Sequence, residues 1–301
     1  MNDSVDKRAL PVAQPKSAPA TICAAATIEP VAPLKKSGLR RFNRKETWIS
    51  LLVLVLFVAG WEWGPSLLGI KPYNIPRLSL VWTETAHLYV NGDLFYHAAI
   101  TCFEVIVGFT LGCLLGAAIG YLLGMSPTTE VVASPYILAL QIAPKVAFAP
   151  LFILWFGYNM TPKILVAVLI VFFPILINVL TAIRTVDPAM INLARSFKAS
   201  RWQIFWKIEF PASMPSLFSG LRIGSTLAVI GVTVGEFVGG NTGLGYLLVQ
   251  GGGQGNTAAV FSAVIMLTVI GIFAYASVIG VERYVLRYMP KRDFGEVAVR
   301  A

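Results

Sequence analysis

Three ionisable side chains, Glu104, Lys145 and Glu236, stand inside stretches of the 301-residue chain that are otherwise almost free of charge. In hydrocarbon an unpaired charge costs at least ~2.5 kcal/mol, so such residues pair with one another, reach an interface or line the path of a solute. Lys145 lies between Pro144 and Pro150, which leaves two interpretations. It lines a translocation path, or it reaches the interface from a bent helix.

The two glutamates allow different roles. Glu104 lies about one helical turn inside its apolar stretch, so we expect it to be a polar cap near an interface. Glu236, in Thr-Val-Gly-Glu-Phe-Val-Gly-Gly, could pair with Lys145, line the path, or form a hydrogen bond to a neighbouring helix end. The candidates for a translocation path are therefore Lys145, Asn178 and Glu236.

No pattern in the chain indicates catalysis. The segment Gly251-Gly-Gly-Gln-Gly-Asn256 lacks the Gly-Lys-Ser/Thr ending of a phosphate-binding loop, and we expect it to be a flexible outer loop. His87 and His97 are expected to be solvated or interfacial, although a ligand pair is the alternative. We find no Walker sequence, metal-binding cluster or nucleophile elbow. We therefore predict no catalytic site, no metal site and no cofactor in this chain.

The composition indicates a membrane protein. Hydrophobic residues make up 56% of the chain and charged residues 13%, against about 25% charged in a soluble domain. The mean hydropathy is +0.71. Since about 20 apolar residues cross a bilayer, we predict an all-α integral membrane protein with six transmembrane helices. They cover residues 48–64, 98–124, 131–156, 164–183, 221–239 and 258–281.

Basic residues predict the orientation of these spans. The N-terminal segment to Lys45 holds nine Lys and Arg, residues 184–218 hold five, and the segment from Arg283 holds five more. The connections on the opposite side hold two. The positive-inside rule then places both termini and the 184–218 connection in the cytoplasm. The net charge of +9 is explained by this bias, so we expect contact with membrane lipid and no nucleic acid as partner.

The predicted organisation has three parts. Residues 1–46 are rich in Ala, Pro, Ser and Lys, and we expect a disordered basic cytoplasmic tail. Residues 47–285 are expected to form the transmembrane domain, and residues 286–301 a short cytoplasmic tail. Within the second span, glycines recur every four residues, which predicts a tight helix–helix seam, with a sliding or gating surface as the alternative. They are Gly108, Gly112, Gly116, Gly120 and Gly124.

The connection between the fourth and fifth spans has the pattern of a helical hairpin. Asp187-Pro188 is typical of a helix start, and Met190, Leu193, Ala194 and Phe197 then form one apolar stripe. A capping-box pattern at Ser200-Arg-Trp-Gln203 starts a second helix with an aromatic face, which we expect to end at Pro211 and Pro215. The stripe could lie on lipid headgroups, pack under its own bundle, or dock into another protein.

These blocks resemble a known family. Ala194-Arg-Ser-Phe-Lys-Ala-Ser-Arg-Trp-Gln-Ile-Phe-Trp-Lys-Ile-Glu-Phe-Pro211, with Gly220-Leu-Arg222, resembles the EAA loop of permease subunits of binding-protein-dependent ABC importers. Their nitrate/sulfonate/taurine branch, with its MetI-like transmembrane domain, is similar in four further blocks. These are Pro144-Lys-Val-Ala-Phe-Ala-Pro-Leu-Phe-Ile-Leu-Trp-Phe-Gly157, Phe173-Pro-Ile-Leu-Ile-Asn178, Val186-Asp-Pro188 and Gly243-Leu-Gly-Tyr246.

The resemblance implies a bacterial inner-membrane permease that moves a small solute, expected to be an anion such as a sulfonate, taurine or nitrate. It implies a second permease copy in a homodimer, two ATPase subunits that hold ATP and Mg, and a periplasmic binding protein. The alternative is a stand-alone secondary transporter or channel. The ATPase-coupling loop would be Asn192, Leu193, Ala194, Arg195, Ser196, Phe197, Lys198, Ala199, Ser200, Arg201 and Trp202.

Two positions of this loop depart from the family pattern. Asn192 stands where the family has glutamate, and Lys198 stands where it has glycine. Glycine suits a left-handed turn between two helices. Lys198 must therefore either adopt that turn at some strain or extend the first helix.

Overall fold

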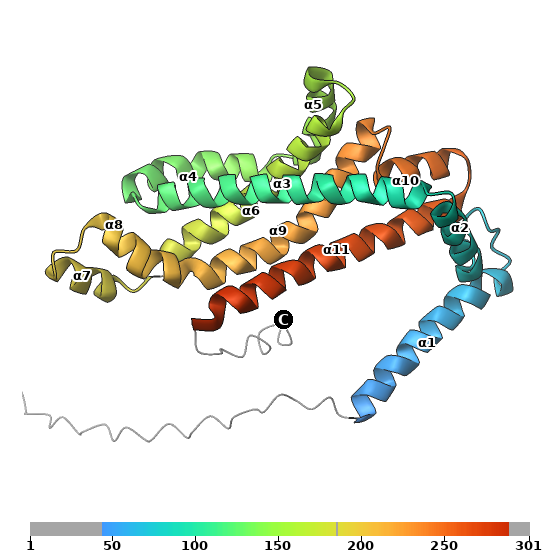
Figure 1. The fold of residues 1–301 in the computed structure, drawn as a ribbon, viewed down its shortest axis with the longest axis horizontal. Coiled ribbons are helices and arrows are strands. Elements are labelled where there is room, and N and C mark those ends of the chain that lie inside the picture. Colours follow the sequence, from blue (N-terminus) through green and yellow to red (C-terminus); the bar gives the residue numbers. More distant parts are fainter. Residues whose placement is uncertain (1–43, 185, 289–301) are drawn as a thin grey trace, which may run out of the picture. The chain divides into compact units, whose positions relative to one another are not determined.

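The computed structural model describes residues 44–184 and 186–288, and the predicted tails lie mostly outside these ranges. The chain divides into a unit that ends at Val53, of which the structure describes the first residues of α1, and a body that begins at Leu54. All regular elements in the described ranges are helical (Figure 1). The longer helices are α1 (Arg44–Leu67), α2 (Leu78–Val90), α3 (Asp93–Gly124), α4 (Pro127–Ile142), α6 (Met160–Arg184), α9 (Phe210–Gly239), α10 (Leu244–Gly253) and α11 (Thr257–Val285).

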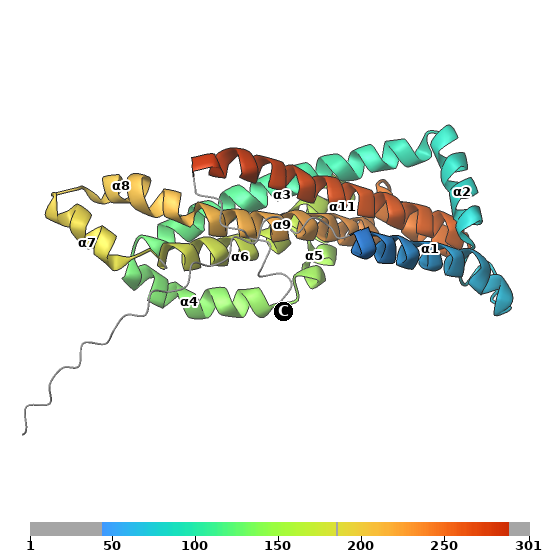
Figure 2. The same ribbon diagram turned by 90° about the horizontal axis from the view of Figure 1, so that it is seen from below.

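The core of the body lies where α6 packs along both α3 and α9. Figures 1 and 2 show these three helices side by side. Many apolar side chains of α6 are fully buried, among them Val166, Val171 and Val179, and most of the others are half-buried. A helix buried this deeply is hydrophobic around most of its circumference, which fits the near absence of charge in its sequence.

The glycine stripe of α3 lies against α6. A Cβ atom on Gly108 would come within 2.7 Å of Ala167 Cβ, and one on Gly116 within 2.7 Å of the Phe172 carbonyl oxygen. One on Gly124 would come within 2.5 Å of Ile183 Cδ1. Gly112 and Gly120 meet α6 in the same way. The two helices therefore approach closely along the whole stripe, as small residues permit.

The described helices fit an integral membrane protein. Five of them are long and apolar enough to cross a bilayer, and a bent pair would make a sixth span. The pair is α4 followed by the 3-10 turn η1 (Lys145–Phe148) and α5 (Ala149–Phe156), with a bend of 79°. Pro144 stands at the break, where its ring and missing N–H interrupt the α-helical hydrogen bonds.

Two sequence-based expectations are wrong. The second hairpin helix, α8 (Arg201–Ile204), does not end at Pro211 and Pro215, because it continues through a π turn, η2 (Phe205–Glu209), into α9. The wider turn shifts the hydrogen bonds, so that Pro211 falls in the first turn of α9 and Pro215 is accommodated inside it.

The second concerns residues 251–253, which belong to α10 and not to a loop. Leu244, Leu247, Leu248 and Gly251 are buried at helical spacing, and their burial against the core explains this helix.

Candidate functional site

The hairpin begins with a capped helix, α7 (Pro188–Ser196). The Asp187 carboxylate accepts a hydrogen bond of 2.8 Å from the Ala189 N–H, and Pro188 occupies the first helical position. Both features satisfy or remove N–H groups that a helix start leaves unpaired. The predicted start of the first hairpin helix is confirmed.

The turn between the two helices is left-handed at Lys198, whose φ is +59°. The Lys198 N–H donates to the Arg195 carbonyl at 2.8 Å, and the Ala199 N–H donates to the Ala194 carbonyl at 3.1 Å. This bonding is a Schellman motif, which usually has glycine at the left-handed residue. Of the two alternatives for Lys198, the strained turn is therefore the one that occurs.

The second helix starts at the predicted capping box. The Gln203 N–H donates to Ser200 Oγ at 3.2 Å, and the Ser200 N–H donates to Gln203 Oε1 at 2.8 Å. One turn later, Phe205 is buried, with its ring 5.4 Å from the ring of Tyr121 on α3. Phe205 thus fixes the base of the hairpin against the helical body.

The rest of the hairpin is exposed. The apolar stripe of α7 is uncovered, with Leu193 60% and Phe197 80% exposed, and Trp202 on α8 is 63% exposed. Among the described residues, nothing of the chain itself buries this stripe. The predicted coupling-loop residues 192–202 thus form one projecting, basic and partly apolar surface.

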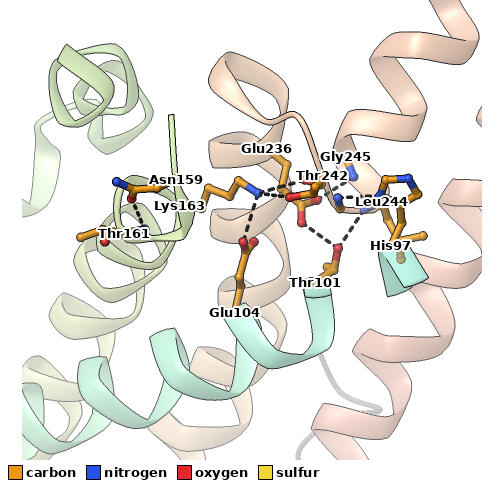
Figure 3. Close-up of polar contacts among 11 residues, drawn as sticks. His97, Thr101, Glu104, Asn159, Thr161, Lys163, Glu236, Thr242, Leu244 and Gly245 are labelled. Atoms are coloured by element: carbon orange, nitrogen blue, oxygen red, sulfur yellow. Dashed lines mark hydrogen bonds and ion pairs between the residues drawn. The ribbon is translucent and has the colours of Figure 1, made fainter. Parts of the chain in front are cut away.

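A second polar site lies among α3, α6 and α9. We call Glu104, Lys163 and Glu236 the buried charge cluster; Figure 3 shows their side chains and polar contacts. Their exposed fractions are 0%, 2% and 1%. Lys163 Nζ donates to Glu104 Oε1 at 3.0 Å, to the Thr242 carbonyl at 2.9 Å and to Thr242 Oγ1 at 3.2 Å. An ammonium group has three donors, so each donor of Lys163 has a partner.

Glu236 accepts hydrogen bonds from two other elements. Thr101 Oγ1 on α3 donates to Glu236 Oε1 at 2.7 Å, and the Gly245 N–H of α10 donates to Glu236 Oε2 at 2.6 Å. Thr101 Oγ1 in turn accepts from the Leu244 N–H at 2.8 Å. Glu236 and Glu104 also interact electrostatically. The cluster therefore joins three spans to the loop of residues 240–243 and the start of α10.

Glycines make room for this cluster. A Cβ atom on Gly243 would overlap the Glu236 carboxylate, and Gly243 has a φ of +107°. One on Gly245 would lie 2.7 Å from Glu236 Cβ. The Gly243 N–H also donates to His97 Nδ1 at 2.9 Å, so this histidine is a structural acceptor. The block Gly243-Leu-Gly-Tyr246 is thus explained by the close approach of a buried carboxylate.

The structure bears on three expectations about ionisable residues. Glu104 is buried and forms an ion pair with Lys163, so it is not a lone polar cap. Glu236 does not pair with Lys145. Of its predicted alternatives, the hydrogen bond to a neighbouring helix end is confirmed, because the Gly245 N–H at the start of α10 donates to its carboxylate. Lys163, which directly precedes the predicted fourth span, was not among the ionisable residues expected inside apolar stretches. A lysine at the predicted outer end of a span runs against the positive-inside rule, and that signal could have identified it.

The other two path candidates lie apart from the cluster. Lys145 is partly exposed at the break after α4, where its Nζ donates to the Gln141 carbonyl at 2.5 Å and stands 5.1 Å from the centre of the Phe173 ring. Asn178 Nδ2 donates to the Pro174 carbonyl of its own helix at 2.8 Å. The described residues contain no group of three or more His, Cys, Asp or Glu placed to hold a metal ion.

Comparison with known proteins gives one family. The family model for the binding-protein-dependent transport system inner membrane component matches residues 108–287. The riboflavin transport system permease protein RibX of Chloroflexus aurantiacus is 37% identical over 86% of this chain and 96% of that protein.

Two further relatives carry the names of sulfonic acids. A permease protein of Bacillus subtilis, SsuC, named for aliphatic sulfonates transport, is 32% identical over 84% of this chain and 91% of its own length. The taurine transport system permease protein TauC of Escherichia coli is 26% identical over 82% and 90%. Among solved structures, the inward-facing MetNI methionine ABC transporter shares the fold, with a TM-score of 0.59 at 19% identity over 65% of this chain and 97% of that chain.

Proposed function

Because the chain belongs to the permease subunits of binding-protein-dependent ABC importers, in the branch of the sulfonate and taurine permeases, we propose that it forms a solute path driven by a separate ATPase. It is a multi-pass protein of the bacterial inner membrane, and members of its family serve transport and not catalysis. ATP and Mg are bound by the partner ATPase in this proposal, and no cofactor by this chain.

The observation that carries the proposal is the exposed hairpin. Its stripe of Met190, Leu193 and Phe197 is apolar, uncovered and flanked by Arg195 and other basic residues. Its base is fixed by Phe205, and its turn is held by the Schellman bonds. Exposed apolar anchors with arginine are typical of the energetic centre of a protein interface. A rigidly based projection of this kind suits a contact that must transmit movement.

The assembly proposed has two copies of the chain around the path, two ATPase subunits on the hairpin side and one binding protein on the opposite side. Both termini and the hairpin are cytoplasmic in this arrangement, as the basic residues predict. ATP binding and hydrolysis would change the separation of the two hairpins, and the helices would carry that movement through the membrane.

The proposed solute is a small organic or inorganic anion such as a sulfonate, taurine or nitrate. Two relatives are named for sulfonic acids, and Lys145 places a partly exposed cation at the bend beside the spans. The most identical of the three relatives described above is named for riboflavin. Permeases that are similar in sequence can be named for very different solutes if the binding protein, and not the permease, selects the solute.

Co-purification tests the proposal. Phe197→Asp or Ala194→Asp puts a charge on the stripe, and the ATPase that remains bound to the parent chain should be lost. Ala189→Asp is the matched control, because it adds the same charge to the same helix near its N-terminus, where an anion is favourable. An ATPase that stays bound to all three variants would contradict the proposal.

A second candidate function is a stand-alone secondary transporter. The buried charge cluster favours it, because paired acidic and basic groups within spans are typical of such proteins. The bent α4–α5 pair is also compatible with it. Uptake that survives Phe197→Asp and follows an ion gradient in ATPase-free vesicles would select this function.

A further inference from the structure

We propose that the buried charge cluster is a latch that positions the loop of residues 240–243, and that the hairpin displaces this latch through one continuous helix. This inference rests on the proposed function, since it takes the hairpin to be the part that the ATPase moves. Glu104, Lys163 and Glu236 act in it as positioning residues, because they hold the loop and need not touch the solute.

One helical element connects the two sites. The hairpin helix α8, the π turn η2 and α9 run from Arg201 to Gly239 without a break, a length of 39 residues. At about 1.5 Å per residue this element is roughly twice the ~30 Å thickness of the hydrocarbon. Arg201 belongs to the hairpin, and Glu236 lies in the last turn of the same element. A displacement at the first end therefore reaches the cluster directly.

The bonds at the far end cross between elements that such a displacement would separate. Glu236 on α9 bonds to Thr101 on α3 and to Gly245 on α10, and Lys163 on α6 bonds to Glu104 on α3 and to Thr242 in the loop. When the end of α9 moves relative to α3 and α6, these bonds must break or exchange partners. The loop continues directly from α9 and is bonded through Thr242 to Lys163 on α6. Its position therefore changes when the latch opens or closes.

The charges are not placed where they would stabilise the helices most. Lys163 lies in the first turn of α6, at the positive end of the helix dipole, and Glu236 lies in the last turn of α9, at the negative end. Apolar residues of similar volume often stabilise a protein as well as a buried ion pair does. A cluster with these features is suited to releasing and re-forming bonds, and a purely structural anchor would not require it.

The test measures how accessible the loop of residues 240–243 is to a thiol reagent in the assembled complex. After Cys23, Cys102 and Cys113 are replaced by alanine, Asn241→Cys introduces a thiol at an exposed position of the loop. The complex of this chain with its co-purified ATPase is placed in lipid nanodiscs. Its reaction rate with a membrane-impermeant maleimide is then measured without nucleotide and with ATP and vanadate.

With the latch intact, the two rates should differ by about fivefold or more, the lower range of ordinary allosteric coupling. The paired substitution Lys163→Met with Glu104→Leu removes the ion pair without leaving either charge buried alone, and it should bring the ratio of rates to unity while the ATPase stays bound. Glu236→Gln, which keeps the size of the side chain, should also lower the ratio. A ratio unchanged in either variant, or a ratio of unity with the latch intact, would overturn the latch.

The matched control is a second ion pair that also involves α9. Arg222 on α9 and Glu282 on α11 are 3.3 Å apart, partly exposed and outside the cluster. The substitutions Arg222→Met with Glu282→Leu should leave the ratio unchanged, and an equal loss there would contradict a specific role of the cluster. If no ATPase binds the parent chain, the proposed function fails and the latch with it. If the ATPase stays bound but the cluster substitutions leave the ratio of maleimide reaction rates unchanged, the latch is rejected and the proposed function stands.

Discussion

The hairpin and the buried charge cluster both interrupt an apolar chain with polar residues, and they do so in opposite ways. The hairpin exposes its apolar stripe and is built from contacts between near neighbours, such as the capping box of Ser200 and Gln203. The cluster buries its charges and is built from residues far apart in sequence, with Glu104 and Lys163 separated by 59 positions. An exposed apolar surface requires a partner, whereas the buried lysine finds its counter-ion, Glu104, within the chain.

The comparison predicts the largest effect for Lys163→Met, which leaves Glu104 buried without its counter-ion. Breaking a buried pair on one side costs about 3–5 kcal/mol. The apparent melting temperature of the detergent-purified protein should fall clearly. Lys198→Met removes an exposed hairpin lysine and should change it little. Equal melting temperatures in the two variants would mean that the cluster contributes nothing to stability.

Gly243→Ala tests the space around Glu236. The new Cβ atom would overlap the carboxylate at a left-handed residue, and strain and overpacking together should cost about 3 kcal/mol. Gly252→Ala, in α10 with nothing within 4 Å, should be neutral or slightly stabilising. Thermal unfolding of the two variants checks this, and a stable Gly243→Ala protein would show that the loop does not need this close approach.

Gly116→Ala extends the comparison to the seam between α3 and α6. A Cβ atom there would lie 2.7 Å from a backbone oxygen, so we expect a loss of about 2 kcal/mol from overpacking. Gly271→Ala on α11, where nothing lies within 4 Å, is the matched control and should not lower the melting temperature. If the two variants have the same melting temperature, the helices separate more easily than their packing implies.

Lys198→Gly has the smallest expected effect and the opposite sign. It removes the strain of a left-handed lysine, worth about 1 kcal/mol, at a residue far from the cluster. Hydrogen exchange at the amides of α7 should slow, because the turn that ends this helix is stabilised. Faster exchange would indicate that the Lys198 side chain makes a contact that the turn depends on.

The hairpin could be predicted from the sequence because its signals are local. The Asp187-Pro188 start, the capping box and the left-handed turn each depend on residues within one or two turns of one another. The long apolar segments and the glycine stripe could also be predicted, because a span needs only a run of apolar residues and the stripe only a regular four-residue spacing. The continuation through Pro211 was not, because a π turn depends on packing and not on a local pattern.

The cluster could not be assembled from the sequence. Lys163 falls just outside the fourth span predicted from hydropathy, and no spacing rule connects it to Glu104 or Glu236. Charge alone allowed a pairing of Lys145 with Glu236 as one alternative, whereas Lys145 at the bend after α4 lies beside Phe173. Partners of buried charges are decided by tertiary packing.

Photo-crosslinking at Phe197 tests the central claim most directly. A benzoylphenylalanine placed there in living cells should form a crosslink to one cytoplasmic protein, and mass spectrometry should identify that protein as a nucleotide-binding ATPase. The same probe at Asn241 should not capture it. Crosslinks from residue 197 to lipid or to an extracytoplasmic protein, with none to an ATPase, would contradict the account.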